Sequence, residues 1–214
     1  YFCSNLQKMT KKERAKIVMT ELEKIYPEVP IPLNHRNAYE LLVAVALSAQ
    51  TTDKKVNEVT PKLFSVAPNP EKMASLEEAE IKELIKEIGL STTKAKNLKI
   101  MANQLLERHN GEVPSNFEDL ENLAGVGHKT ASVVMSQAFG VPAFPVDTHI
   151  HRLMKQWKLT EGKNVVQTEN DAKKLFPKET WNKLHLQIIF YGREYSPARG
   201  NQEKDYLTKM LFEK

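Results

Sequence analysis

The segment Leu120–Ile150 joins two helical sequence patterns through a pair of closely spaced glycines, and it constrains the fold of this 214-residue chain more than any other part. Apolar Leu120 and Leu123 lead into Gly125-Val126-Gly127, and apolar residues resume at helical spacing after it. This pattern predicts a short helix, a tight hairpin and a second helix that begins at His128.

The hairpin has the features of an anion-binding site. Glycine leaves backbone N–H groups exposed and lets another molecule approach closely, while Val126 can fill the core beneath the turn. The helix that begins at His128 directs its positive dipole end and its unpaired N–H groups to the same place. Phosphate is the anion that this arrangement favours.

Two ionisable residues near the hairpin are candidates for chemistry. Lys129 lies in the first turn of the second helix, where desolvation and the helix N-terminus would both oppose its charge and favour a neutral, nucleophilic amine. Asp147 follows eighteen residues later and is placed to cap a further helix. From these residues alone, a solvated lysine and an ordinary capping aspartate remain open interpretations.

The same residues resemble a known signature. LAGVGHKTASVV followed by VDTHI is similar to the helix-hairpin-helix signature of the endonuclease III family of DNA glycosylases, L-P-G-V-G-x-K-T and then V-D-T-H. The resemblance extends from about Lys11 to Arg199 and includes LLVAVALSAQTTD, EIGLSTTKAKNL, HNGEVP and FYGRE. One departure is Ala124, where proline is usual, and we expect it to change the rigidity of the hairpin and not its chemistry.

The resemblance implies a bifunctional DNA glycosylase and apurinic/apyrimidinic lyase of base excision repair. It implies that Lys129 attacks C1′ of a damaged nucleotide flipped out of double-stranded DNA, and that Asp147 offsets the charge developing on the sugar. The expected substrates are oxidised pyrimidines and abasic sites. Two alternatives stay open: a glycosylase for another lesion, such as an oxidised purine, and a non-catalytic helix-hairpin-helix DNA-binding protein.

The resemblance also implies DNA contacts outside the catalytic pair. Gln50 matches the residue that fills the space left by the flipped nucleotide, and its amide offers donors and acceptors to the orphaned base. Leu90 matches an apolar wedge, and a hydrophobic contact after a Gly89 C-cap is the alternative. The other expected DNA contacts are Gly125, Val126, Gly127, His128, Thr130 and Arg193, and the expected substrate pocket adds Ser48, Asp53 and His149.

Many members of this family hold a [4Fe–4S] cluster on four cysteines, which this chain lacks. The matching positions are Ser196, Glu203, Tyr206 and Phe212, and none supplies a thiolate, so we expect no cluster. We also expect no metal site at the histidines, which lack carboxylate or thiolate companions. An apolar stripe predicts a short helix from about Asp205 that docks on the terminal domain and replaces the structural role of the cluster; it consists of Tyr206, Leu207, Met210 and Leu211.

Helical patterns account for most of the sequence and predict an all-α fold of two domains on either side of a DNA-binding cleft. The expected central domain is a helical bundle over residues 32–145 with the helix-hairpin-helix at 116–140. The expected terminal domain combines residues 1–31 and 146–214. The apolar stretch Leu41–Leu47 predicts a helix in the middle of the bundle. Helix caps are expected at Thr10, Asn37, Asp53, Ser75 and Thr93.

Composition narrows the class of protein further. Residues 1–30 and 147–214 carry 19 basic and 13 acidic side chains, and residues 31–146 carry 12 and 14. The basic ends favour an anionic partner such as DNA, although ordinary solvated faces would give the same balance. The longest apolar run is far shorter than the roughly 20 residues of a membrane span, and no signal peptide is visible, so we expect a protein of the bacterial cytoplasm or nucleoid. A monomer is the default expectation. The single cysteine, Cys3, excludes a disulfide within the chain.

Overall fold

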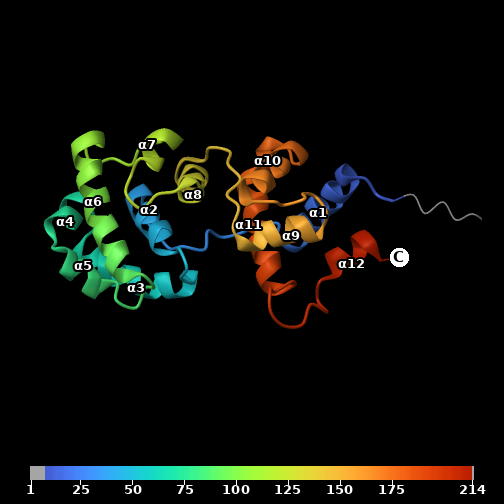
Figure 1. Ribbon diagram of the computed structural model, residues 1–214, viewed down its shortest axis with the longest axis horizontal. Helices are drawn as coiled ribbons and strands as arrows, with labels where there is room; N and C mark the ends of the chain where they lie inside the picture. Colours follow the sequence, from blue (N-terminus) through green and yellow to red (C-terminus); the bar gives the residue numbers. More distant parts are fainter. Residues whose placement is uncertain (1–7, 214) are drawn as a thin grey trace, which may run out of the picture. The chain divides into compact units, whose positions relative to one another are not determined.

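The structure, a computed structural model, describes residues 8–213, and the regular elements in this range are all helices (Figure 1). The predicted all-α class is therefore confirmed. The chain divides into two compact units. The central unit is Ile31–Ala143, and the terminal unit combines the chain up to Pro30 with the chain from Phe144 onward. Cys3 lies outside the described residues.

The central unit is built around one apolar helix. Its helices are α2 (Ala38–Leu47), α3 (Asp53–Val66), α4 (Pro70–Ser75), α5 (Glu78–Leu84), α6 (Ser91–His109), α7 (Phe117–Glu121) and α8 (His128–Phe139). α2 contacts α3, α6 and α8, and Figure 1 shows it between α6 and α8. Because Leu41, Leu42 and Val43 are consecutive and fully buried, α2 has no face for water, and its predicted central position is confirmed.

The terminal unit brings the two ends of the chain into one core. Its helices are α1 (Lys11–Ile25), α9 (Thr148–Gln156), α10 (Val165–Leu175), the 3-10 turn η1 (Lys178–Thr180), α11 (Trp181–Glu194) and α12 (Tyr206–Phe212). Trp157 and Tyr191 are buried at its centre with ring centroids 5.8 Å apart. Arg14 of α1 donates from Nε to Trp157 O (3.0 Å) and from Nη2 to Lys158 O (2.8 Å), which satisfies carbonyls at the end of α9.

Two of the predicted helix caps are confirmed. Thr10 and Glu13 form a capping box at the start of α1. The Asn37 side chain accepts a hydrogen bond from the Glu40 N–H at the start of α2 (2.9 Å). Both residue types are preferred at this position because their side-chain oxygen satisfies an N–H that the first helical turn leaves unpaired.

The other three predicted caps are wrong. Thr52, and not Asp53, caps α3. Ser75 ends α4, and the capping box of α5 is formed instead by Glu77 with Glu80. α6 begins before Thr93, directly after Leu90, which caps it in a left-handed backbone conformation without a side-chain hydrogen bond. Thr52 and Glu77 thus take the places predicted for Asp53 and Ser75, and the start of α6 has no side-chain cap.

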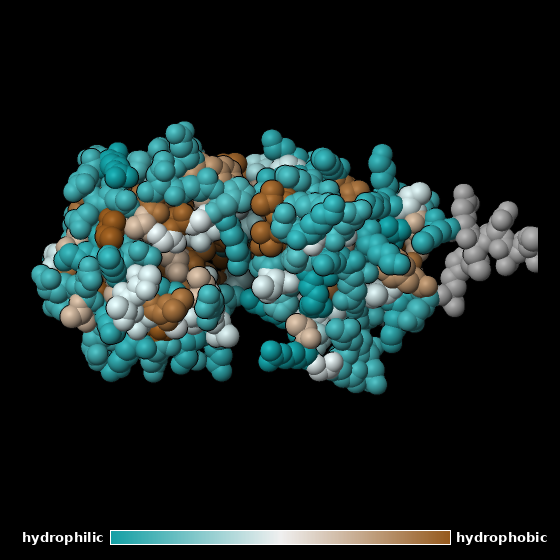
Figure 2. All heavy atoms as spheres, viewed as in Figure 1, coloured by the Kyte–Doolittle hydropathy of each residue, from teal (hydrophilic) through white to brown (hydrophobic). Residues whose placement is uncertain are grey.

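The surface is mainly polar. On the face shown in Figure 2, hydrophilic residues cover most of both units and hydrophobic residues form separate small patches. Among residues 8–213, no helix is both long enough and apolar enough to cross a lipid bilayer.

Candidate nucleic-acid interface and active site

The hairpin between α7 and α8 has the predicted backbone. Gly125 has φ +75°, a backbone conformation that residues other than glycine rarely adopt, and a Cβ there would lie 3.1 Å from Asn97 Cβ of α6. Val126 is 7% exposed and anchors the turn in the core. Gly127 precedes α8 without a side-chain hydrogen bond to the helix. The first N–H groups of α8 therefore lack the usual side-chain cap and can meet an anion.

Lys129 lies in the first turn of α8 with its side chain exposed. The prediction that burial desolvates this amine is therefore wrong for the free chain. Thr130, next to it, is partly buried. The neighbouring His128 turns toward α7: its ring stacks on Phe117 with centroids 5.7 Å apart, and Nδ1 lies 2.7 Å from Glu121 Oε1. His128 and Lys129 are thus both exposed at the start of this helix, and the His128 ring is engaged with α7.

The turn after α2 presents Gln50 to solvent. Gln50 is exposed and has φ +57°, which is unusual for a residue other than glycine. Ser48, a predicted pocket residue, is partly buried, and its hydroxyl donates to Val45 O (2.7 Å) and so closes the helix end. Asp53, another predicted pocket residue, is partly buried at the first position of α3.

The turn before α6 presents Leu90 in the same way. Leu90 has φ +59° and is 59% exposed. Its side chain is therefore largely open to solvent, and neither core cluster of the described residues includes it. The wedge and the hydrophobic contact after a Gly89 C-cap both stay predictions. A Cβ added at Gly89 would lie 3.6 Å from Thr51 Oγ1 and 3.7 Å from Gln50 O. The structure thus brings the Gln50 and Leu90 turns together within the central unit.

In the terminal unit, Asp147 caps α9 as predicted. Its Oδ1 accepts a hydrogen bond from the Ile150 N–H at 2.8 Å. The preceding residues Phe144 and Val146 are buried and hold the extended entry to the helix in the core. The side chain of Asp147 is partly exposed, so a carboxylate fixed at one oxygen by the helix start is open to solvent.

The predicted site residues His149 and Arg193 lie on α9 and α11, which approach each other closely. A Cβ added at Gly192 would lie 3.0 Å from His149 Nδ1 and 3.2 Å from Leu153 Cδ1. Gly192 is therefore required for the two helices to pack at this distance, which explains the glycine in FYGRE. Arg193, the next residue, is exposed near the C-terminal end of α11.

Two buried residues beside these sites were missed by the sequence reasoning. Lys94 of α6 is 8% exposed. It follows the same spacing as buried Leu98 and Met101, and this register is the signal that indicates burial. His185 of α11 is 1% exposed. Burial lowers its pKa to about 4, and the Trp181 carbonyl and the charge of Asp147 oppose that shift.

The residues at the four cysteine positions do not fit an iron–sulfur cluster. Ser196 is fully buried, and its backbone carbonyl and hydroxyl accept hydrogen bonds from Arg152. Glu203 is exposed, and the ring of Tyr206 packs edge-on against Tyr191 at 6.0 Å. Phe212 lies under the Lys158 ammonium, 4.9 Å from its ring centroid. Hydroxyl and aromatic side chains committed to these contacts offer no thiolate set for iron.

A hydrogen-bond network around Asp205 occupies this region. Asp205 caps α12 and is 3% exposed; Tyr191 donates its hydroxyl to Oδ1 (2.7 Å) and Gln156 donates Nε2 to Oδ2 (2.7 Å). Burial opposes ionisation of this carboxyl, but hydrogen bonds from Tyr191, Ser196 and Thr208 outweigh it and hold the pKa below its usual value. The network therefore favours a charged Asp205.

The short helix α12 begins after Asp205, as predicted, and half of its apolar stripe is buried. Leu207 and Leu211 pack in the core of the terminal unit, with 0% and 4% exposure. Met210 is 48% exposed, so its predicted place in the stripe is wrong. Tyr206, the remaining residue of the stripe, is partly buried and packs against the same core.

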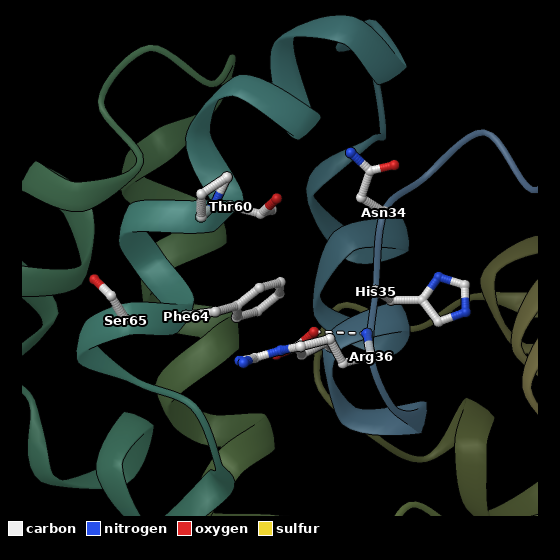
Figure 3. Close-up of a pocket in the computed structure, with 8 residues that line it drawn as sticks. Asn34, His35, Arg36, Thr60, Phe64 and Ser65 are labelled. Carbon is white, nitrogen blue, oxygen red and sulfur yellow. Dashed lines mark hydrogen bonds and ion pairs between the residues drawn. The ribbon is translucent and has the colours of Figure 1, made fainter.

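A pocket of about 410 Å³ in the central unit includes none of the predicted site residues (Figure 3). It is lined by Asn34, His35, Arg36, Glu40, Thr60, Pro61, Phe64 and Ser65. Its charged groups neutralise each other, because Glu40 accepts hydrogen bonds from the backbone N–H of Arg36 (2.7 Å) and from the Arg36 guanidinium (2.6 and 2.8 Å). The pocket therefore offers no unpaired charge for a phosphate.

Comparison with known proteins gives a consistent result. Residues 43–178 match the HhH-GPD superfamily of base excision DNA repair proteins. Endonuclease III of Haemophilus influenzae is 44% identical over 191 residues, which cover 89% of this chain and 90% of that protein. A non-covalent endonuclease III–DNA complex matches with a TM-score of 0.89 and 39% identity over 93% of this chain and 95% of that one.

A second solved structure, a trapped endonuclease III–DNA covalent intermediate in an estranged-adenine complex, has a TM-score of 0.88 and 40% identity over 91% of this chain and 92% of that one. These similarities cover nearly the whole chain and join the sequence signature to the observed fold. The chain therefore belongs to the endonuclease III family of base excision repair enzymes, and it is a DNA glycosylase and lyase.

Proposed function

We propose that this enzyme removes oxidised pyrimidines from double-stranded DNA and then cleaves the abasic strand. The observation that carries the proposal is the exposed Lys129 at the uncapped start of α8, beside a glycine hairpin. The match to a trapped covalent intermediate of endonuclease III with DNA supports it, because a covalent intermediate requires a nucleophile on the protein.

In the proposed glycosylase step, the Lys129 amine attacks C1′ of the flipped nucleotide. A bond forms between the amine nitrogen and C1′, and the bond from C1′ to the base nitrogen breaks, so that the base leaves and takes up a proton. Asp147 offsets the positive charge that develops on the sugar and accepts a proton from the amine.

In the proposed lyase step, the amine nitrogen bound to C1′ forms the double bond of a Schiff base as the bond from C1′ to the ring oxygen O4′ breaks, and O4′ takes up the proton that the nitrogen loses. Removal of a 2′ proton then allows the bond from C3′ to the 3′ phosphate oxygen to break by β-elimination. Water releases the sugar fragment and regenerates Lys129. A water nucleophile would leave no Schiff base, so the lysine is what makes this second reaction available.

The proposed DNA contacts are those at which the structure leaves groups exposed. The hairpin residues Gly125 and Gly127 and the start of α8 would bind a backbone phosphate through their N–H groups. Gln50 would fill the space of the flipped nucleotide, and Leu90 would enter the stack on the opposite strand. The proposed contribution of Arg193 is a further phosphate contact.

We further propose that the enzyme works as a monomer without an iron–sulfur cluster. The chain around Ser196 and Asp205 is stabilised by buried hydrogen bonds and by the docking of Leu207 and Leu211. This network and α12 together would replace the structural role of the cluster. No step of the proposed reaction depends on an iron–sulfur cluster.

Borohydride trapping on a duplex with one thymine glycol tests this function. The wild type should give a covalent adduct, Lys129→Gln should give none, and Gln50→Ala should still give one. Lys12→Gln is the matched control, because Lys12 is an exposed lysine in the first turn of α1. A wild type that binds this duplex but neither forms an adduct nor nicks it would be a non-catalytic DNA-binding protein. An adduct that forms only on oxidised purines would change the proposed substrate from oxidised pyrimidines to oxidised purines.

A further inference from the structure

The N-terminal part of α6 contains a buried lysine, Lys94, to which the reaction above gives no role. Its ammonium donates to Leu47 O (2.9 Å), Ala49 O (2.6 Å) and Thr51 Oγ1 (3.3 Å). An ammonium has three donors, and burying it costs free energy unless they are satisfied. Here all three acceptors belong to one segment, the end of α2 and the turn after it.

This segment carries Gln50, and Lys94 holds it on both sides. α2 has no basic residue in its last turn, so its own sequence offers no cation to the negative end of the helix dipole. Lys94 supplies that cation from another helix. Its bonds to Ala49 O and Thr51 Oγ1 fix the residues immediately before and after Gln50.

The backbone of Lys94 also holds the Leu90 turn. The Lys94 N–H donates to Leu90 O at 2.9 Å, the first hydrogen bond of α6. Gln50 and Leu90 both have a left-handed backbone, with φ +57° and +59°. Residues other than glycine persist in this conformation only where their surroundings hold them. One residue thus restrains both turns, through its side chain in one case and its N–H in the other.

We propose that Lys94 is a positioning residue that locks the Gln50 and Leu90 turns into one rigid unit before DNA binds. This inference rests on the proposed function, because it takes Gln50 and Leu90 to enter the duplex. Without the ammonium, the Gln50 turn loses three hydrogen bonds and has to be ordered by the DNA, which weakens binding to a distorted duplex.

The test compares Lys94→Met, which keeps the aliphatic stem and removes the donors, with Lys99→Met. Lys99 is a matched control, because its ammonium also donates from α6 to a backbone carbonyl, that of Leu76, in a different turn. Single-turnover trapping is measured on an abasic duplex and on the same abasic strand alone. The single strand has no opposite base for Gln50 or Leu90 to contact, so a merely structural defect would slow both substrates equally.

We expect Lys94→Met to slow trapping on the duplex about tenfold, corresponding to the loss of roughly 1.4 kcal/mol, and to slow the single strand less than about twofold. Lys99→Met should change neither rate by more than about twofold. The losses from Lys94→Met and Gln50→Ala should also combine to less than their product, because both act through one turn.

Equal slowing of both substrates, or wild-type rates in folded Lys94→Met, would overturn the inference. If Lys94→Met lacks a cooperative thermal transition, Thr51→Val is measured in its place, because it removes one of the three acceptors of the Lys94 ammonium. Slower trapping on the duplex alone then supports the inference, and unchanged trapping on the duplex overturns it. A wild type that traps both substrates while Gln50→Ala and Leu90→Ala have no effect refutes this inference and the proposed contacts of these two residues, and leaves the glycosylase and lyase reactions standing. A wild type that traps neither substrate refutes the proposed function as well.

Discussion

The buried histidine of α11 makes the stability of this protein depend on pH. His185 is 1% exposed; its Nδ1 contacts Trp181 O at 2.9 Å, and its Nε2 has no hydrogen-bond partner among the described residues. Burial lowers its pKa from the usual 6.5 to about 4. The ring is therefore neutral in the folded protein under conditions in which the unfolded chain begins to take up a proton.

The size of the effect follows from the two pKa values. Because the unfolded state binds this proton more tightly, protonation favours unfolding, and the contribution of His185 to stability is lost as the pH falls from about 6.5 toward 4. Each unit of pKa difference is equivalent to about 1.4 kcal/mol. The loss between pH 8 and pH 5 is then about 2 kcal/mol, and it approaches roughly 3 kcal/mol near pH 4.

Urea unfolding at pH 8 and pH 5 measures this loss. The wild type should lose about 2 kcal/mol more than His185→Phe between the two values, whatever the absolute stability of the variant. His109→Gln is the control, because His109 is only partly buried at the end of α6, and it should keep the wild-type dependence. Equal losses in the wild type and His185→Phe would show that His185 is not held neutral by burial.

Three further predictions concern stability. Asp205→Ala removes the cap of α12 and the acceptor of the buried Tyr191 and Ser196 hydroxyls, so the free energy of unfolding should fall by on the order of 3 kcal/mol; an unchanged melting temperature contradicts this. Gly192→Ala places a Cβ 3.0 Å from His149 Nδ1 and should cost about 1–3 kcal/mol in urea unfolding; wild-type stability would mean that α9 and α11 separate freely. Gly125→Ala should cost about 1–3 kcal/mol in thermal unfolding, because the backbone there has φ +75°. Gly127→Ala should cost less, because position 127 has open space and an extended backbone. Equal losses in the two variants would refute this explanation of the hairpin.

The sequence was sufficient to predict structural features that depend on residues close together along the chain. Thr10, Asn37 and Asp147 were identified as caps because each bonds an N–H three residues along its own helix. The hairpin was identified because Gly125 and Gly127 are two residues apart and flanked by helical spacing. The central position of α2 followed from composition alone, since a helix without a polar face must be surrounded.

The sequence was insufficient where the partner is distant along the chain. The spacing that marks Lys94 as buried does not reveal its acceptors in the turn after α2, 43 to 47 residues away. Leu90 begins α6 because its turn packs on the Gln50 turn, which no local rule captures. Met210 follows Tyr206 by four residues, as Leu211 follows Leu207, but its side chain is 48% exposed, and the spacing alone does not distinguish it from the buried leucines.

The identity of the nucleophile is the most direct test of the account. A duplex with one thymine glycol is trapped with borohydride and digested with nuclease and trypsin, and the peptide that carries the sugar is sequenced by mass spectrometry. Modification at Lys129 blocks tryptic cleavage at this residue, so we expect the adduct on a peptide of residues 109–152. An adduct on any other lysine, with residues 109–129 recovered unmodified, would contradict the assignment of Lys129 and the mechanism built on it.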